Sequence, residues 1–174
     1  EQIEASQDRR YGGTGLGLAR IEGTVTGPGG AVEGALVSAV PVGGAPSEAI
    51  DEAMARPSVV ARSGAGGGFR LPGLSEGTYA VTATAPGLAA AFQGELTVAD
   101  GVARSGVALR MQSGGVTYRG RIADKQGQPL PGTMVHADRQ TASRGDVFTA
   151  AADASGRYAV TLPVGEYDWN GVPA

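Results

Sequence analysis

The chain has 174 residues with a formal net charge of −3, and 41% of them are hydrophobic while only 5% are aromatic. The negative charge argues against a nucleic-acid partner, and the absence of cysteine excludes disulfide bonds and thiolate zinc sites. No run approaches the roughly 18 consecutive apolar residues of a membrane-spanning helix, and 30 glycines with 10 prolines favour many short strands over helices.

Residues 1–19 differ from the rest of the chain, because they are polar and then glycine-rich and show no alternation. The segments 1–3 (EQI), 10–13 (RYGG) and 13–19 (GTGLGLA) resemble the ATP-lid end and glycine box of sensor histidine kinases. That resemblance implies backbone N–H groups that approach nucleotide phosphates. Pro28 forbids the long helix that should hold the box, and the Asn-bearing helix and Asp-x-Gly-x-Gly segment of that family are missing. We therefore expect an irregular leader without catalysis.

From residue 20 onwards apolar and polar residues alternate, which predicts a half-buried strand containing Ile21 and Val25. A helix is expected at 47–56, because this segment begins with a serine that can cap it and ends before Pro57. Further strands are expected at 35–42, 59–62, 69–71, 79–85, 93–98 and 107–111. About seven strands are typical of a small antiparallel sandwich, which we place at 20–112.

A second strand-rich segment occupies residues 116–174. The linker at 113–115 has so few residues that the two segments are expected to stay close together. The strands of this segment are expected at 118–123, 133–137, 148–152, 158–162 and 167–169.

The two segments repeat one pattern, in which a strand crosses a Gly/Pro turn and a later aromatic strand leads to a Gly-x-Tyr strand. Self-similarity of this kind indicates one supersecondary unit that is used twice. The matched pairs are Gly23 with Gly120, Gly34 with Gly132, Phe69 with Tyr158, Gly77 with Gly165, and Tyr79 with Tyr167.

The second copy is shorter than the first. After Tyr79 the first copy continues for 32 residues, to Met111, whereas seven residues follow Tyr167. The second sandwich is therefore expected to lack at least one strand, and two by direct comparison. An unfilled sandwich exposes apolar surface and unpaired backbone groups, which readily recruit another strand. Two explanations stay open: the protein continues beyond Ala174, or another chain supplies the strand, with residues 1–19 a candidate donor by position.

The turns of the second copy carry a recurring motif, at 120–122 (GRI), 131–135 (PGTMV), 153–158 (DASGRY) and 162–167 (LPVGEY). This motif resembles the carboxypeptidase regulatory-like family, whose fold is a transthyretin-like β-sandwich. The first copy departs from it at 64–68, where glycines replace the aspartate. The resemblance implies a mostly non-catalytic module of secreted or surface proteins: a spacer, a polymer-forming domain or a weak carbohydrate binder. It also implies that Tyr79 and Tyr167 are corner tyrosines, which bond a neighbouring loop through their hydroxyls.

No catalytic, cofactor-binding or metal-binding residue is predicted. His136 has no second histidine or cysteine to share a metal, so we interpret it as an exposed strand residue. The acidic residues lack the spacing of a calcium loop, so turn capping and helix-dipole effects explain them better. Tyr167 and Trp169 could stack on a sugar, but a core or edge position is favoured, and the serines have no base at credible spacing. The residues weighed are His136; Asp124, Asp138, Asp146 and Asp153; Glu48, Asp51 and Glu52; Ser63, Ser143 and Ser155; Tyr167 and Trp169; and Gly13 to Gly17.

The sequence therefore predicts an all-β chain with a leader at 1–19, a transthyretin- or immunoglobulin-like seven-stranded sandwich at 20–112, and an incomplete second one at 116–174. We expect a non-catalytic structural or adhesive module of an extracytoplasmic, bacterial-type surface protein, in a fibre or surface layer built by strand complementation. Its expected partners are other protein chains, in a homo-oligomer or polymer, with a glycan as a further candidate. No cofactor, nucleic acid or membrane span is expected. The alternatives are a carbohydrate- or peptide-binding module of a larger secreted enzyme or receptor, and a fragment of a sensor histidine kinase.

Overall fold

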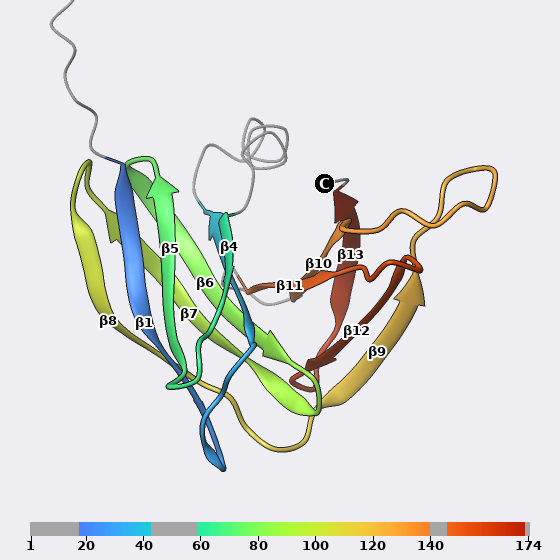
Figure 1. The fold of residues 1–174 in the computed structure, drawn as a ribbon, viewed down its shortest axis with the longest axis horizontal. Coiled ribbons are helices and arrows are strands. Elements are labelled where there is room, and N and C mark those ends of the chain that lie inside the picture. Colours follow the sequence, from blue (N-terminus) through green and yellow to red (C-terminus); the bar gives the residue numbers. More distant parts are fainter. Residues whose placement is uncertain (1–17, 43–58, 140–145, 173–174) are drawn as a thin grey trace, which may run out of the picture.

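The computed structural model describes residues 18–42, 59–139 and 146–172, and within these ranges the chain forms thirteen β-strands and no helix (Figure 1). The first unit contains β1 (Ala19–Gly27), β2 (Gly30–Ala31), β3 (Leu36–Pro41), β4 (Val59–Arg62), β5 (Gly68–Leu74), β6 (Gly77–Ala85), β7 (Leu88–Val98) and β8 (Ala103–Arg110). The second unit contains β9 (Val116–Arg121), β10 (Met134–Arg139), β11 (Val147–Ala151), β12 (Arg157–Leu162) and β13 (Tyr167–Val172). The predicted all-β class is confirmed. The helix predicted at 47–56 lies outside the described residues.

Two sheets pack face to face in the first unit. One sheet has the order β2-β1-β5, with β8 paired in parallel to β1, and the other has the antiparallel order β4-β3-β6-β7. The alternation in β1 turns Ile21 and Val25 inward, where both are completely buried. The same core contains Leu71 of β5 and Val81 of β6, also completely buried.

The second unit has the same two layers with fewer strands. Its sheets have the orders β12-β9 and β11-β10-β13, and every pairing in them is antiparallel. The core between these sheets contains Phe148, Val160 and Leu162. Two residues of the first unit, Ala90 and Phe92 of β7, pack against this core as well. Strand β7 of the first unit therefore contributes side chains to the core of the second unit.

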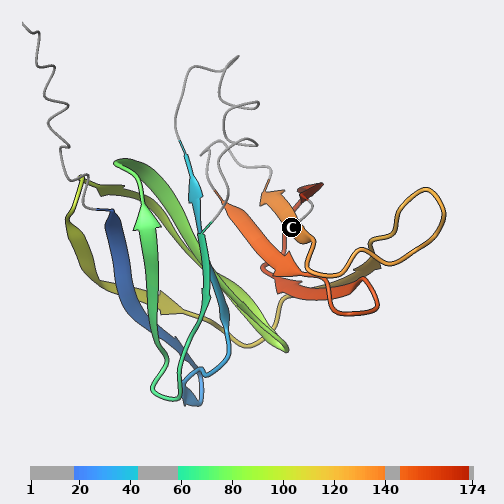
Figure 2. The same ribbon diagram turned by 45° about the horizontal axis from the view of Figure 1, so that its top comes forward.

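The two units join at the outer face of the β3-β6-β7 sheet, against which β11 and β12 lie (Figure 2). Strand β6 is consequently buried along both faces from Tyr79 to Thr84. At the join, Ser38 Oγ donates to Thr149 Oγ1 at 3.1 Å and lies 2.9 Å from Thr82 Oγ1. Thr84 Oγ1 donates to the carbonyl oxygen of Thr149 at 2.8 Å. These hydroxyls bond one another, and the hydrogen bonds offset the cost of removing polar groups from water.

The structure corrects the sequence-based interpretation of His136. This residue is half-buried rather than exposed, and its Nδ1 lies 3.1 Å from Thr149 Oγ1. Burial lowers the pKa of the imidazole below its ordinary value, and the nearby charge of Asp138 opposes that change. The interpretation was wrong because the His136 side chain was expected to point to solvent, whereas Thr149 of the neighbouring strand β11 lies beside it.

Strand β7 also begins five residues earlier than the predicted start at 93, at Leu88. The extra residues include a run of three alanines, Ala89 to Ala91, with no apolar-polar alternation. Alanine suits this strand because its two faces contribute to different cores: Ala91 to that of the first unit and Ala90 to that of the second. A strand buried on both faces does not alternate.

No apolar helix of membrane-spanning length occurs in the three described ranges.

Candidate functional site

The internal repeat extends to individual hydrogen bonds, which defines the counterpart of each strand. Four backbone hydrogen bonds of the first unit recur at matched positions of the second. In the first unit they are Val25 N–H to Gly67 O, Val32 N–H to Val25 O, Gly34 N–H to Ser63 O and Gly67 N–H to Gly64 O. In the same order, the second unit has Ile122 N–H to Gly156 O, Leu130 N–H to Ile122 O, Gly132 N–H to Ala152 O and Gly156 N–H to Asp153 O. Strands β9, β10, β11, β12 and β13 are thus the counterparts of β1, β3, β4, β5 and β6. Within the described residues, the second unit has no counterpart of β7 or β8.

Two strands of the second unit therefore have an open edge among the described residues. In the first unit β6 pairs with β3 on one side and with β7 on the other, whereas β13 pairs with β10 alone. Likewise β1 pairs with β5 and β8, whereas β9 pairs with β12 alone. Because β7 and β8 lie at the same end of the first sandwich, the open edges of β13 and β9 border one gap between the two sheets. We call this gap, with its two bordering strands, the open edge.

Side chains at the open edge are more exposed than their counterparts in the first unit. Trp169 of β13 is 36% exposed, whereas Val81, at the same position in β6, is 0% exposed. Val116 of β9 is 42% exposed, whereas its counterpart Ala19 is 0% exposed. In the first unit β7 and β8 pair with β6 and β1 at these edges, whereas β13 and β9 have no such neighbour among the described residues.

Aromatic rings gather at the open edge, and they come from both sheets. The ring centroid of Trp169 lies 5.1 Å from that of Tyr118, 6.1 Å from that of Tyr158 and 6.5 Å from that of Tyr167. Tyr167 also packs edge-on against Phe148 of the core, at 6.0 Å. We call Tyr118, Tyr158, Tyr167 and Trp169 the aromatic cluster. Partial burial raises the pKa of the Tyr167 phenol.

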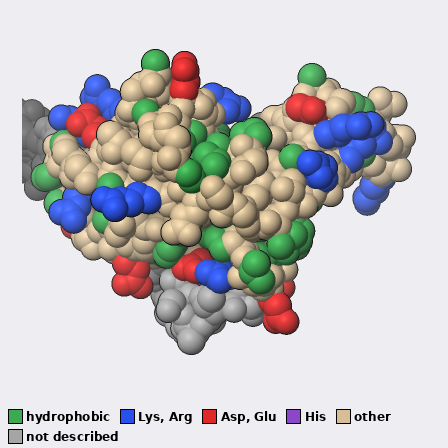
Figure 3. Space-filling view, turned by 90° about the horizontal axis from the view of Figure 1, so that it is seen from below, with side chains coloured by type: hydrophobic (Ala, Val, Ile, Leu, Met, Phe, Trp, Pro, Cys, Tyr) green, Lys and Arg blue, Asp and Glu red, His purple; other side chains and the backbone are tan. Residues whose placement is uncertain are grey.

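Positive charge gathers at the same end of the molecule. Four basic side chains are exposed there: Arg119 and Arg121 of β9, Lys125 of the turn after β9, and Arg157 of β12. Figure 3 shows lysine and arginine side chains at both ends of the molecule, one group of them at the end formed by the second unit, with hydrophobic side chains along the middle of this face.

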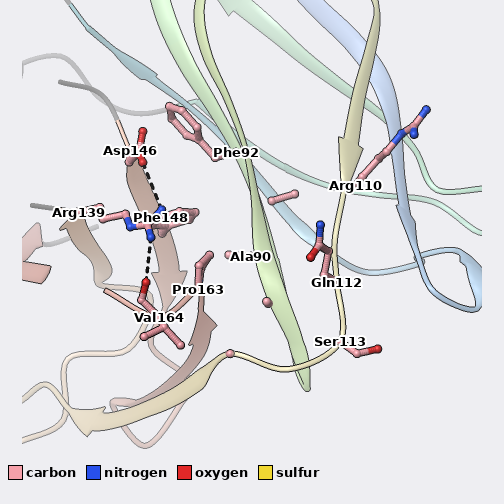
Figure 4. Close-up of a pocket in the computed structure, with 13 residues that line it drawn as sticks. Ala90, Phe92, Arg110, Gln112, Ser113, Arg139, Asp146, Phe148, Pro163 and Val164 are labelled. Atoms are coloured by element: carbon pink, nitrogen blue, oxygen red, sulfur yellow. Dashed lines mark hydrogen bonds and ion pairs between the residues drawn. The ribbon is translucent and has the colours of Figure 1, made fainter. Parts of the chain in front are cut away.

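A second candidate is a cleft of about 400 Å³ between the two units (Figure 4). Its apolar wall contains Phe92 of β7 and Phe148 of β11, whose ring centroids lie 6.3 Å apart. Two of its polar side chains interact with each other: Arg139 pairs with Asp146 at 3.8 Å and donates to the carbonyl oxygen of Val164 at 2.8 Å. Arg110, Gln112 and Ser113 line it as well. The cleft is therefore a part of the junction with a mixed apolar and polar lining.

The structure confirms several roles predicted from sequence. The hydroxyl of Tyr79 donates to the carbonyl oxygen of Ser75 at 3.0 Å, and that of Tyr167 donates to Pro163 at 2.6 Å, as expected of corner tyrosines. Asp153 accepts hydrogen bonds from Ser155 Oγ at 2.7 Å and from Ser155 N–H at 2.8 Å, and these bonds lower the pKa of its carboxyl group.

Asp124 caps its turn in the same way, at 2.9 Å from Gln126 N–H. The described residues contain no group of three His, Asp or Glu side chains that could hold a metal ion. Ser63 is buried and bonds the backbone of Val32 and Ala35, a structural role.

Other predicted residues lie outside the described ranges: the glycines of 13–17, Glu48, Asp51 and Glu52 of the expected helix, and Ser143.

Sequence reasoning missed two members of the aromatic cluster, Tyr118 and Tyr158. A signal for the first was present, because Tyr118 stands where the first unit has the aliphatic Ile21. A large amphipathic ring in place of a core aliphatic residue suits a position that reaches water at one end.

The sequence model of one protein family, the carboxypeptidase regulatory-like domain, matches residues 20–112, which is more than half of the chain. No curated protein sequence matches the chain.

Several solved structures resemble it at low identity. One is the TIE protein of Bacillus anthracis, at 16% identity and a TM-score of 0.39, with 91% of this chain and 28% of that chain covered. Another is a streptococcal ancillary pilin, at 13% identity and a TM-score of 0.42, with 92% of this chain and 55% of that chain covered. The shaft pilin SpaA from Lactobacillus rhamnosus GG is a third, at 11% identity and a TM-score of 0.40, with 90% of this chain and 87% of that chain covered. The chain thus spans about a quarter and about half of the length of the first two. Similarities at this level do not transfer a function.

Proposed function

Because the chain belongs to the carboxypeptidase regulatory-like family, we propose that it is a non-catalytic structural or adhesive module of an extracytoplasmic protein. In this proposal it joins other protein chains in a fibre or surface layer at the cell exterior. The contact between chains is strand complementation at the open edge of the second unit.

The observation that carries the proposal is the exposure of core positions at the open edge. Trp169 and Val116 face the inside of the second sandwich, yet both are at least 36% exposed. A sheet edge with unpaired backbone groups beside exposed apolar side chains favours pairing with a further strand. Head-to-tail pairing that does not close on itself produces a filament.

The junction between the units supports a mechanical role. Strand β6 packs on both faces, and the hydroxyls of Ser38, Thr82 and Thr149 bond across the join. A junction with a shared core resists bending more than a flexible linker does. The two units are therefore suited to act as one stiff spacer.

The test is the state of the full chain in solution and by negative-stain electron microscopy. The proposal predicts ordered polymers or large assemblies whose amount rises with protein concentration. Discrete two-lobed monomers at all concentrations would remove the assembly role.

A carbohydrate-binding role is the second candidate, and the aromatic cluster is the observation that favours it. Aromatic rings at a surface can stack on sugars, and Trp169 is exposed. A glycan array with the wild type and Trp169→Ala would detect this role. Saturable binding of a glycan that the variant loses would support it over the structural role.

A further inference from the structure

We propose that the first unit bears tension along the chain, and that the parallel pair of β1 and β8 is the element that resists it. A pull on the two ends of this unit slides β1 and β8 past each other instead of separating them sideways. This inference rests on the proposed structural role, because a spacer in a fibre or surface layer carries load along its own chain. We call the paired strands β1 and β8 the clamp.

The direction of the two strands decides how the clamp is loaded. Strand β1 is the first strand of the unit and follows residues 1–18, whereas β8 is the last and leads through the linker at 113–115 into the second unit (Figure 1). Because the two strands are parallel, the start of β1 and the end of β8 lie at opposite ends of the pair. Tension along the chain therefore pulls the two strands in opposite directions along their common axis.

Sliding loads the hydrogen bonds of the clamp together. Six residue pairs are in register along it, with one register shift after Ile21. Backbone bonds secure both ends: Arg20 N–H donates to Val102 O at 3.3 Å, and Met111 N–H donates to Thr26 O at 2.7 Å. The bonds of a parallel pair are evenly spaced, so the load is distributed along the ladder and several bonds must break in one step.

The core protects the clamp from water on its inner face. Ile21 and Val25 of β1 are completely buried, and Val107 and Leu109 of β8 are buried beside them. At Gly23 the strands approach so closely that an added Cβ would overlap the carbonyl oxygen of Val107. Water that cannot reach a stretched bond cannot replace it, so the buried side favours an intact ladder under load.

The same two strands can also be pulled apart from one end, which provides the control direction. Leu18 precedes β1 and Val102 precedes β8, and both side chains are exposed. The two positions lie at the same end of the clamp, because the carbonyl oxygen of Val102 accepts from Arg20 N–H. Tension between them opens the clamp from that end, one bond after another.

The test is single-molecule force spectroscopy on the full chain, which contains no cysteine of its own. One variant carries Leu18→Cys and Ser113→Cys, so that its handles pull along the chain. The other carries Leu18→Cys and Val102→Cys, so that its handles open the clamp from one end. All three sites are exposed, and the second unit lies outside both pairs of handles.

At one loading rate, the mean unfolding force should be at least about twofold higher along the chain than in the opening direction, because forced unfolding follows the barrier on the path that is pulled. Urea denaturation is the matched measurement. Equal midpoints for the two variants would show that the pulling direction, and not stability, causes the difference in force.

A substitution inside the clamp makes the test specific for these two strands. In both handle variants, Gly23→Ala should bring the ratio of the two forces closer to one, because the added Cβ would push β8 away from β1. Gly29→Ala, where nothing lies within 4 Å of an added Cβ, should leave the ratio unchanged. Should Gly23→Ala fail to fold, the two pulling directions in the unsubstituted background decide alone.

Two results would overturn the inference: a force along the chain that is equal to or lower than the opening force, or a force ratio that Gly23→Ala leaves unchanged. Polymers built from a chain with equal forces in both directions would refute this inference and leave the proposed function standing. A high force along a chain that never assembles would refute the proposed assembly and leave the clamp standing.

Discussion

The rings of Tyr118 and Trp169 lie 5.1 Å apart, centroid to centroid, and connect the two sheets of the second unit across the open edge. Their counterparts in the first unit, Ile21 and Val81, are fully buried aliphatic residues. Where the first unit uses two further strands to close the sandwich, the second uses larger rings that tolerate water at one end. The aromatic cluster therefore stabilises a sandwich in which β13 and β9 each pair with a single strand among the described residues.

The corner tyrosines should each contribute measurably to stability. Replacement of Tyr79 or Tyr167 by Phe removes a hydroxyl that donates to a backbone carbonyl four residues earlier. We expect the free energy of unfolding to fall by about 1 kcal/mol in each variant, as measured by urea denaturation. Tyr158→Phe is the control, because the Tyr158 hydroxyl has no hydrogen bond to any described residue. Unchanged midpoints for both corner variants would remove the assignment.

The turn between β4 and β5 requires glycine at one position and tolerates another residue beside it. Gly67 has a φ of 73°, and an added Cβ would overlap the carbonyl oxygen of Val25. Gly67→Ala is therefore expected to destabilise the protein by roughly 1–3 kcal/mol in thermal or chemical denaturation. Gly66→Ala, where nothing lies within 4 Å of an added Cβ, should stay within about 0.5 kcal/mol of the wild type. Equal effects of the two changes would argue against this turn geometry.

The hydroxyl of Thr149 connects the two units, so its removal should weaken the whole chain. Thr149→Val leaves Ser38 Oγ and His136 Nδ1 without that partner in a buried site. The expected loss is about 1–2 kcal/mol of unfolding free energy. The control is Thr78→Val, which removes one member of an exposed hydroxyl pair 3.3 Å apart and should be nearly neutral. A neutral Thr149→Val would contradict the bonded junction.

Stability should depend on pH through His136, the only histidine of the chain. Burial lowers its pKa below the ordinary 6.5, so the unfolded chain binds a proton more readily than the folded one. The contribution of His136 to the free energy of unfolding is therefore fully present above about pH 6.5. It falls as the pH drops below that value, and the fall ends below the lowered pKa. Urea denaturation between pH 8 and pH 5 should show this fall, and His136→Gln should flatten it. The same slope in both proteins would exclude His136 as its source.

The repeat predicted most of the strand positions in both segments, because glycine turns and the Gly-x-Tyr strand leave a clear pattern. It did not predict how the strands are ordered in the sheets. The junction was not predictable in the same way. Thr82 and Thr84 alternate with inward aliphatic residues in β6, as they would on a solvent-facing strand. A threonine suits both water and a buried partner such as Thr149, so tertiary packing alone distinguishes the two environments. The interpretation of His136 failed for the same reason.

The central claim is that β13 pairs with β10 alone among the residues that the structure describes, and amide hydrogen exchange tests it most directly. The measurement compares individual amides of β13 and β6 by NMR, at a concentration where the protein sediments as a monomer. Alternate amides of β13, those pointing away from β10, should exchange rapidly, whereas the corresponding amides of β6 should be protected by β7. Slow exchange along both edges of β13 in the monomer would contradict the account.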